Sequence, residues 1–134
     1  MSKTSEISVF CRRNDIQSYN NLNVTPLYSD LQFNNIVGQV IAGTNLTQYS
    51  EGNDLETYLS AILYFYLDNK ETNQKDTITV VLNTYNGSTK SFINPGFFIC
   101  QIIAGQGKYQ GASGEAYIYV DENLTRYFKI IVRY

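Results

Sequence analysis

Apolar and polar residues alternate with a period of two along most of this 134-residue chain, which is typical of half-buried β-strands. The longest such run covers residues 57–67 and divides into two faces. One face carries Leu59, Ala61, Leu63, Phe65 and Leu67, and the other carries Tyr58, Ser60, Ile62, Tyr64 and Tyr66. Strand-like runs also cover residues 7–12, 36–42, 77–82, 97–103, 115–120 and 127–134. The pattern therefore predicts seven or eight strands.

Short polar segments with turn chemistry separate these runs. Asn86-Gly87 favours a hairpin turn because both residues tolerate positive φ, and Asn94-Pro95-Gly96 favours another turn. Many short strands joined by polar turns predict an all-β fold, either an antiparallel barrel or a sandwich. One segment has an alternative: residues 53–56 resemble a helix capping box, so a helix starting at Asp54 competes with a strand. The alternation and the aromatic content favour the strand.

The length suits a single domain covering residues 1–134, with residues 1–5 as a flexible N-terminus. The net charge of −2 gives no basic surface for nucleic acid or for an anionic membrane. No apolar run approaches the roughly 20 residues that a membrane-spanning helix needs, and residues 1–15 contain no apolar core of a signal peptide. We therefore expect a cytoplasmic protein that has no membrane span and does not bind nucleic acid.

The chain contains no histidine, which removes the usual general base near neutral pH and the usual zinc ligand. Its two cysteines, Cys11 and Cys100, are far apart and lack metal-binding spacing. Both lie in apolar strand-like runs, which predicts buried free thiols that pack as small apolar groups. A disulfide between them is the alternative for a secreted chain. We expect neither a metal nor an organic cofactor.

Residues 104–116 read AGQGKYQGASGEA and contain four glycines. Their spacing differs from the dinucleotide fingerprint, and strand-like residues follow where that fingerprint needs a helix. The segment is better explained as a structural corner between two strands. In such a corner Gly105 and Gly107 turn the chain through positive φ, and Tyr109 plugs the bend. Gly111 and Gly114 leave room for close neighbours.

A resemblance to a known family lies in the same segment. Residues 102–116, IIAGQGKYQGASGEA, resemble the signature of the allene oxide cyclase and dirigent superfamily, which often reads GGTGxFxGAxG. The resemblance implies an eight-stranded antiparallel β-barrel with a lipocalin-like, mostly apolar cavity, assembled as a homo-oligomer, either trimer or dimer. It also implies cofactor-free steering of reactive hydrophobic intermediates: allene oxide cyclases set the stereochemistry of a cyclisation, and dirigent proteins guide radical coupling.

The segment departs from the family signature at several positions. Ala104 and Gln106 stand where the family carries glycine and threonine. Gln110 and Ser113 stand where dirigent motifs carry arginines, so a reactive intermediate would lose that cationic partner. We therefore do not carry the coupling of phenols over to this chain.

In a barrel, alternate side chains of each strand point into the interior. We expect the tyrosine face of residues 57–67 to line a cavity, with Tyr58, Tyr64 and Tyr66 offering hydroxyl groups to a ligand. The alternative places this face on the outer wall, at an oligomer interface. The same two placements apply to Tyr117 and Tyr119, which we also expect to bind the ligand.

Two carboxylates are candidates for acid–base chemistry. Glu115 follows the glycine corner, where partial burial would raise its pKa and suit it to general acid or base catalysis; a solvated barrel rim is the alternative. Asp30 precedes the run at residues 36–42, roughly where the resembled family often carries acidic residues. Arg12 and Arg13, at the end of the first run, either bind a carboxylate or form an ordinary charged strand end.

Two functions from different classes follow. The first is a cyclase-like or dirigent-like guide that holds a flexible hydrophobic molecule in one conformer, so that shape and a few hydroxyl groups select the product. The second is a non-catalytic barrel: a ligand carrier, a carbohydrate-binding module or an oligomeric structural protein. The missing corner arginines and the lack of a strong base favour the second.

Overall fold

The computed structural model describes the backbone of residues 2–20, 22–51, 54–86 and 96–134, and the side chains of these residues except 44–51, 54–60 and 83–86. The described chain is almost entirely β-strand. Its strands are β1 (Thr4–Cys11), β2 (Gln17–Tyr19), β3 (Leu22–Tyr28), β4 (Ile36–Glu51), β5 (Asp54–Asn69), β6 (Gln74–Asn86), β7 (Gly96–Gln106), β8 (Ser113–Val120) and β9 (Arg126–Arg133). Two single-turn 3-10 helices, η1 (Arg13–Asp15) and η2 (Gly107–Tyr109), precede β2 and β8.

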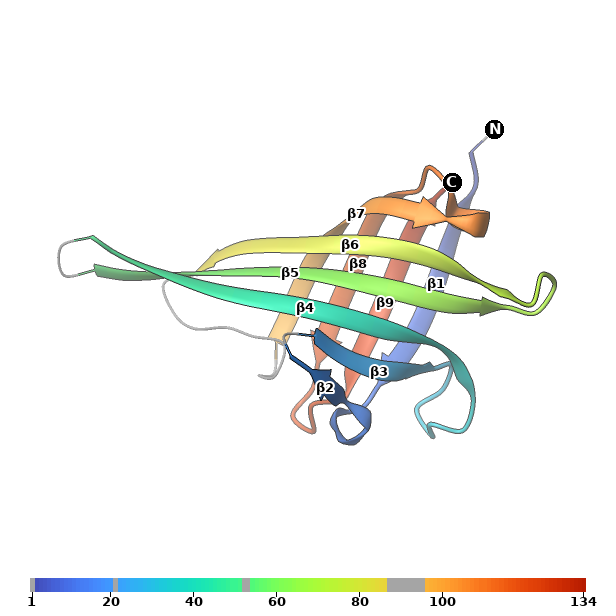
Figure 1. Cartoon of the computed structure of the whole chain (residues 1–134), viewed down its shortest axis with the longest axis horizontal. Helices are drawn as coiled ribbons and strands as arrows, with labels where there is room; N and C mark the ends of the chain where they lie inside the picture. The colour runs from blue at the N-terminus through green and yellow to red at the C-terminus, as the bar shows by residue number, and fades with distance from the viewer. Residues whose placement is uncertain (1, 21, 52–53, 87–95) are drawn as a thin grey trace.

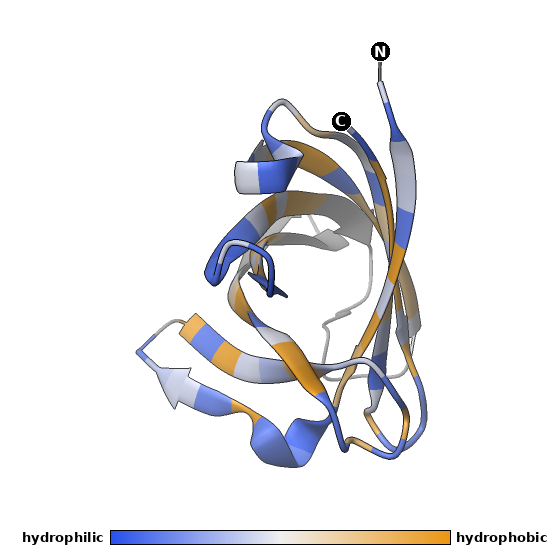
Figure 2. Cartoon of the chain, turned by 90° about the vertical axis from the view of Figure 1, so that its right-hand side faces the viewer, coloured by the Kyte–Doolittle hydropathy of each residue, from blue (hydrophilic) through white to orange (hydrophobic). Residues whose placement is uncertain are grey.

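The strands form one antiparallel sheet in the order β1-β9-β8-β7-β6-β5-β4-β3-β2. A pairing between β1 and β3, at Phe10 and Tyr28, closes eight of them into a barrel, and β2 pairs with β3 outside this ring. Figure 1 shows β1, β8 and β9 behind β4, β5 and β6, and Figure 2 shows the strands curving around a common axis. The predicted eight-stranded antiparallel barrel is confirmed, and the sandwich is wrong.

The alternation along each strand decides which side chains fill the barrel. On β5, Leu63 and Phe65 are buried whereas Ile62 and Tyr64 are exposed, so the leucine and phenylalanine face points inward. The same alternation buries one face of β8 and one face of β9. Together these inward faces make a single apolar core.

Aromatic rings fill the middle of the barrel. β5 and β9 are four strands apart in a ring of eight, so they lie on opposite walls. Phe65 from β5 and Phe128 from β9 meet edge to face, with ring centroids 5.1 Å apart and planes at 78°. Both are almost completely buried, at 0% and 2% exposure. Since edge-to-face contact is a favourable arrangement of aromatic rings, the interior at this level is packed and is no open channel.

Two sequence expectations need correction, and one alternative is decided. β3 was not among the predicted strand-like runs, and it contains Pro26, a residue that is disfavoured within strands. The proline is tolerated here because it lies between Val24, which pairs with β2, and Tyr28, which pairs with β1. The strand that we favoured over a helix starting at Asp54 is confirmed, since β5 begins at that residue. Residues 4 and 5, expected in the flexible N-terminus, belong to β1.

The glycine corner joins β7 to β8 through η2, and a buried carboxylate anchors it. Gly107 has a φ of +68°, and a Cβ at this position would overlap Oδ1 of Asp76. That oxygen accepts a hydrogen bond from the backbone N–H of Lys108 at 3.1 Å, and Oδ2 accepts one from Nδ2 of Asn69 at 2.9 Å. The segment is therefore a structural corner, as its glycine spacing indicated.

Tyr109 closes this end of the barrel. Its side chain is buried, and its ring meets that of Tyr134 edge to face at 5.1 Å. Gly105 is required because the backbone carbonyl of Tyr109 packs against it, whereas Gly111 has a φ of +76° and open space beside it. We expected a positive φ at Gly105 and a close contact at Gly111, and the structure shows the reverse.

Candidate functional site

The tyrosine face of β5 points away from the barrel interior. Tyr64 is 37% exposed and Tyr66 is half-buried, and both alternate with the buried Leu63 and Phe65. This placement corrects the expectation that the face lines a cavity and matches the outer-wall alternative. Each hydroxyl keeps access to water there, which an apolar interior would not provide. Ligand binding by these residues stays a prediction, now for the outer wall; the side chain of Tyr58 lies outside the described residues.

Tyr117 and Tyr119 also face outward, from β8, and take part in a ladder of stacked rings. The ladder runs from Phe97 to Tyr119 at 4.8 Å, to Tyr127 at 5.6 Å and to Phe10 at 4.9 Å between centroids. Tyr117 stacks on Phe97 at 6.2 Å. These five residues, on β7, β8, β9 and β1, are called the aromatic ladder below. Three of its ring pairs are stacked, and the pair of Phe97 and Tyr119 is tilted.

Neither carboxylate expected to do acid–base chemistry is placed inside the barrel. Glu115 lies half-buried on the outer face of β8, where Oε1 is 3.4 Å from Nη2 of Arg133. Oδ1 of Asp30 accepts the backbone N–H groups of Gln32 at 3.0 Å and Asn34 at 3.3 Å, so it shapes the loop before β4. Both placements indicate structural roles, and the geometry does not support catalysis by either residue.

Three polar side chains are buried among the described residues: Thr25, Asp76 and Arg126. Asp76 belongs to the glycine corner. Arg126 alternates with the buried Phe128 on β9, so its side chain is on the inward face, and its Nη1 donates to the carbonyl of Leu124 at 3.4 Å. Thr25 is 6% exposed, and its Oγ1 has no hydrogen-bond partner among the residues that the structure describes. An unpaired buried hydroxyl is costly, which makes Thr25 a candidate ligand contact.

Thr25 and Arg126 lie at the same end of the barrel. Cys11 pairs with Arg126 across β1 and β9, and Phe10 pairs with Tyr28 across β1 and β3. Because β3 runs antiparallel to β1, the residues before Tyr28 lie at the Cys11 end. The Tyr109 plug lies at the opposite end, where its ring contacts Tyr134 after the last residue of β9. We call Thr25, Arg126 and Cys11 the polar end of the barrel. It combines a guanidinium, a hydroxyl and a thiol with apolar walls.

Sequence reasoning missed the polar end. The signal for Arg126 was present, because extending the alternation of β9 by one step places it on the inward face with Phe128. Thr25 could not be found, since its strand was not predicted. Its orphaned hydroxyl is visible only once β3 and β4 are paired, with Thr25 opposite Val40.

Cys11 and Cys100 are free and buried, as predicted. Burial raises the pKa of each thiol to about 12, and for Cys11 the neighbouring Arg126 opposes that rise. Both thiols are therefore protonated near neutral pH. Since the thiolate is the nucleophilic form, neither cysteine is suited to covalent catalysis.

Cofactor sites can be assessed for the described residues alone. Within them, no three His, Cys, Asp or Glu side chains come together as a metal site would require. No described helix has the length and apolar character needed to cross a membrane.

Comparison with solved structures identifies the barrel type. The chain is similar to a pterocarpan synthase dirigent protein, with a TM-score of 0.60 and 15% sequence identity over 99% of this chain and 86% of that protein. No family model matches the sequence, and no curated protein sequence matches it. The likeness shows a dirigent-like barrel fold, which agrees with the resemblance of the glycine segment.

Proposed function

We propose that the polar end of the barrel binds a small hydrophobic molecule that carries a hydrogen-bond acceptor, such as a carbonyl or an acidic oxygen. The observation that carries the proposal is the unpaired hydroxyl of Thr25, buried on the inward face of a dirigent-like barrel. A ligand oxygen there would satisfy this donor, and Arg126 on the same inward surface supplies a charged donor. The apolar walls would hold the rest of the molecule.

The chemistry that these groups support is orientation of the ligand. Asp76, the buried carboxylate of the described interior, is held by Lys108 and Asn69. The thiols stay protonated, so the described interior offers no strong base or nucleophile. We propose that the barrel guides a cyclisation or coupling by restricting the conformers of a reactive molecule. The structure that it resembles is that of a dirigent protein named as a pterocarpan synthase. The free thiols support the cytoplasmic location that we propose.

The substitution Thr25→Val tests this proposal, because it keeps the side-chain shape and removes the hydroxyl. We expect the free protein to gain about 1 kcal/mol of stability, since an unpaired buried hydroxyl is lost. We expect affinity for 8-anilinonaphthalene-1-sulfonate, an apolar probe with an acceptor group, to fall about tenfold. Urea denaturation measures the first effect, and a fluorescence titration measures the second.

Thr79→Val is the matched control, because Thr79 lies half-buried on the outer face of β6. Thr79→Val should change neither the free energy of unfolding nor the affinity for the probe by a comparable amount. Near-UV circular dichroism confirms that the probe binds the native state and no loosened form. The proposal is wrong if the probe does not bind saturably, or if Thr25→Val binds it as tightly as the unsubstituted protein.

We further propose that the aromatic ladder is a contact between copies of this chain. Phe97 is 51% exposed and Tyr119 is 42% exposed, and Ile99 and Ile103 on the same strand as Phe97 are 54% and 55% exposed. Exposed apolar side chains gathered on one part of the outer wall favour burial against a partner. This supports the expected homo-oligomer.

Phe97→Glu is expected to convert the oligomer to a monomer of 15.3 kDa, because the new charge would have to be buried at the contact. Sedimentation velocity measures the mass. Leu31→Glu is the control, since Leu31 is 58% exposed and lies in the loop before β4, outside the four strands that carry the ladder. Equal masses for Phe97→Glu and the unsubstituted chain would contradict the proposal.

A further inference from the structure

A groove of about 490 Å³ lies on the outer wall, separate from the barrel interior. Its sheet side comes from outward residues of β3 and β4, including Val24, Pro26 and Gln39, and from the paired ends of β5 and β6. Its other side is the arm formed by η1 and the start of β2, residues 14–17. The volume lies within the roughly 300–1,000 Å³ range of small-molecule sites.

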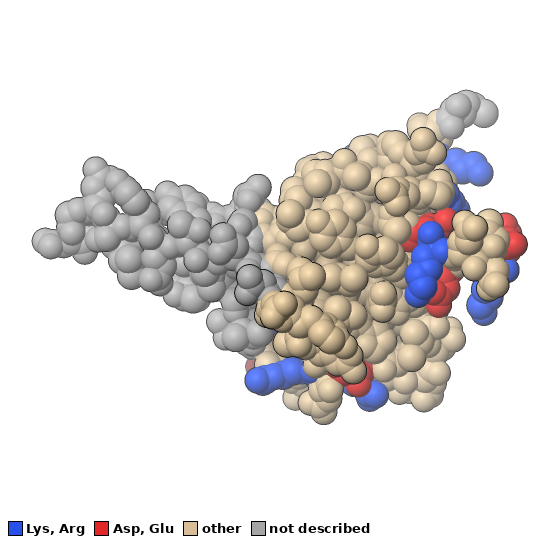
Figure 3. All heavy atoms as spheres, in the orientation of Figure 1, with Lys and Arg blue, Asp and Glu red and all other residues tan. Residues whose placement is uncertain are grey.

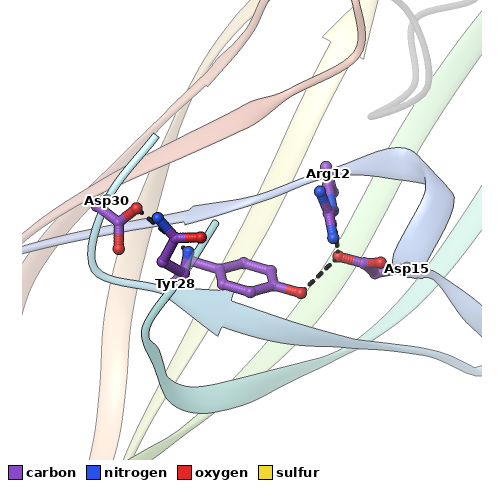
Figure 4. Close-up of polar contacts among 5 residues, drawn as sticks. Arg12, Asp15, Tyr28 and Asp30 are labelled. Carbon is purple, nitrogen blue, oxygen red and sulfur yellow. Dashed lines mark hydrogen bonds and ion pairs between the residues drawn. The ribbon is translucent and has the colours of Figure 1, made fainter. Parts of the chain in front are cut away.

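The arm presents a carboxylate that its neighbours hold in place (Figure 4). Oδ2 of Asp15 accepts Nε–H of Arg12 at 2.7 Å and the hydroxyl of Tyr28 at 2.8 Å. Among the described side chains, none donates to Oδ1, which leaves that oxygen for a group in the groove. Burial alone would raise the pKa of Asp15, but these two hydrogen bonds hold it below its ordinary value. The carboxylate is thus an oriented, ionised acceptor.

The charges around the groove are already compensated. Asp15 pairs with Arg12, and across the groove Nζ of Lys75 is 3.2 Å from Oδ1 of Asp68. Figure 3 shows basic and acidic atoms side by side near the turn between β5 and β6. A charged ligand would therefore gain little net attraction, because each charge already has its partner. A neutral ligand with several hydroxyl groups matches the side chains better, since amides and carboxylates exchange hydrogen bonds with hydroxyls.

We propose that this groove binds a neutral carbohydrate, a mono- or disaccharide. Oδ1 of Asp15 accepts a sugar hydroxyl, and Gln39 both donates and accepts. Val24 and Pro26 provide an apolar surface for the C–H groups of the sugar ring. This site is independent of the polar end of the barrel, and a failure of one assignment leaves the other standing.

NMR titration of the ¹⁵N-labelled full chain tests the assignment. The probes are neutral methyl glycosides of hexoses, pentoses and N-acetylhexosamines, together with maltose, cellobiose and lactose. We expect saturable shifts of the backbone amides of residues 14–17 and of Gln39 with at least one probe, without shifts at Thr25 or Arg126. Binding should not weaken as salt is raised, because the ligand is uncharged.

Gln39→Ala is expected to lower the affinity for that probe about tenfold, because one hydrogen-bonding group is lost. Gln39 is on the outward face, so circular dichroism should show an unchanged fold. Gln110→Ala, at an exposed glutamine of the glycine corner, is the matched control and should bind as the unsubstituted chain does. Sulfate and glycine should not shift the groove amides. The assignment is overturned if no carbohydrate shifts them, if sulfate or glycine binds there more tightly, or if Gln39→Ala has no effect.

Discussion

Replacing Phe65 with alanine is expected to lower the free energy of unfolding by about 3–5 kcal/mol. Phe65 is fully buried, and its ring crosses the interior to meet Phe128 on the opposite wall. The strands on both sides are tied into a closed ring, so they cannot collapse into the space that the ring leaves. For a small domain with about 5–15 kcal/mol of stability, the loss is a large fraction. Urea denaturation measures it as a lower midpoint at an unchanged slope.

Phe97→Ala is the matched control for this result, because Phe97 is an exposed phenylalanine on the outer wall. It should cost about 1 kcal/mol or less in the monomer. Equal losses of unfolding free energy for Phe65→Ala and Phe97→Ala would show that the centre of the barrel is open and that Phe65 does not pack as described. The comparison also bears on function, because a filled centre confines an interior ligand to the polar end.

Alternation revealed the two faces of β5 but could not say which face is inside. Both faces are apolar: one carries Leu63 and Phe65, and the other carries Ile62 and Tyr64. The twelve tyrosines of the chain do not distinguish an outer wall from an interior in the sequence, because each combines a large apolar ring with a polar tip. Tertiary packing decides which face is inside, because the ring of Phe65 packs against Phe128 on the opposite wall.

The candidate sites depend on contacts between distant residues, and this is why most of them escaped prediction. Arg12 and Asp15 are three residues apart and could be paired from sequence, but Tyr28, which fixes the same carboxylate, comes from another strand. The groove beside them is formed partly by β3, a strand that was not predicted. Thr25 needs the same strand. The barrel was predictable because its signals are local: period two, polar turns and closely spaced glycines.

The glycine corner shows the same division between local and distant causes. Gly107 and its positive φ followed from a local turn. The need for glycine at position 114 is not local. Gly114 has a φ of +133°, and a Cβ there would overlap the backbone carbonyl oxygen of Ile131 on the neighbouring strand β9. The glycine spacing predicted a close neighbour at Gly114, but nothing in the nearby sequence identifies that neighbour as Ile131 of β9.

Gly114→Ala is therefore expected to destabilise the protein by about 3 kcal/mol. A non-glycine residue at this φ costs about 1–3 kcal/mol by itself, and relief of the overlap with Ile131 requires β8 and β9 to separate locally. Amide hydrogen exchange should show faster exchange in the paired residues of β8 and β9 around this position. Chemical denaturation measures the loss of stability.

Gly43→Ala separates strain from the substitution itself, because Gly43 also lies in a strand and its added Cβ would meet Leu22 Cδ2 at an ordinary 3.4 Å. That variant should be close to neutral. Gly111→Ala provides an intermediate case. Its φ of +76° is strained for a non-glycine residue, but the space beside it is open, so its loss of stability should lie between those of Gly43→Ala and Gly114→Ala. The loss of stability should be smallest for Gly43→Ala and largest for Gly114→Ala. This order is expected only if the close approach of Ile131 and the positive φ both contribute. Similar losses at positions 111 and 114 would mean that φ alone sets the requirement and that the contact with β9 is not tight.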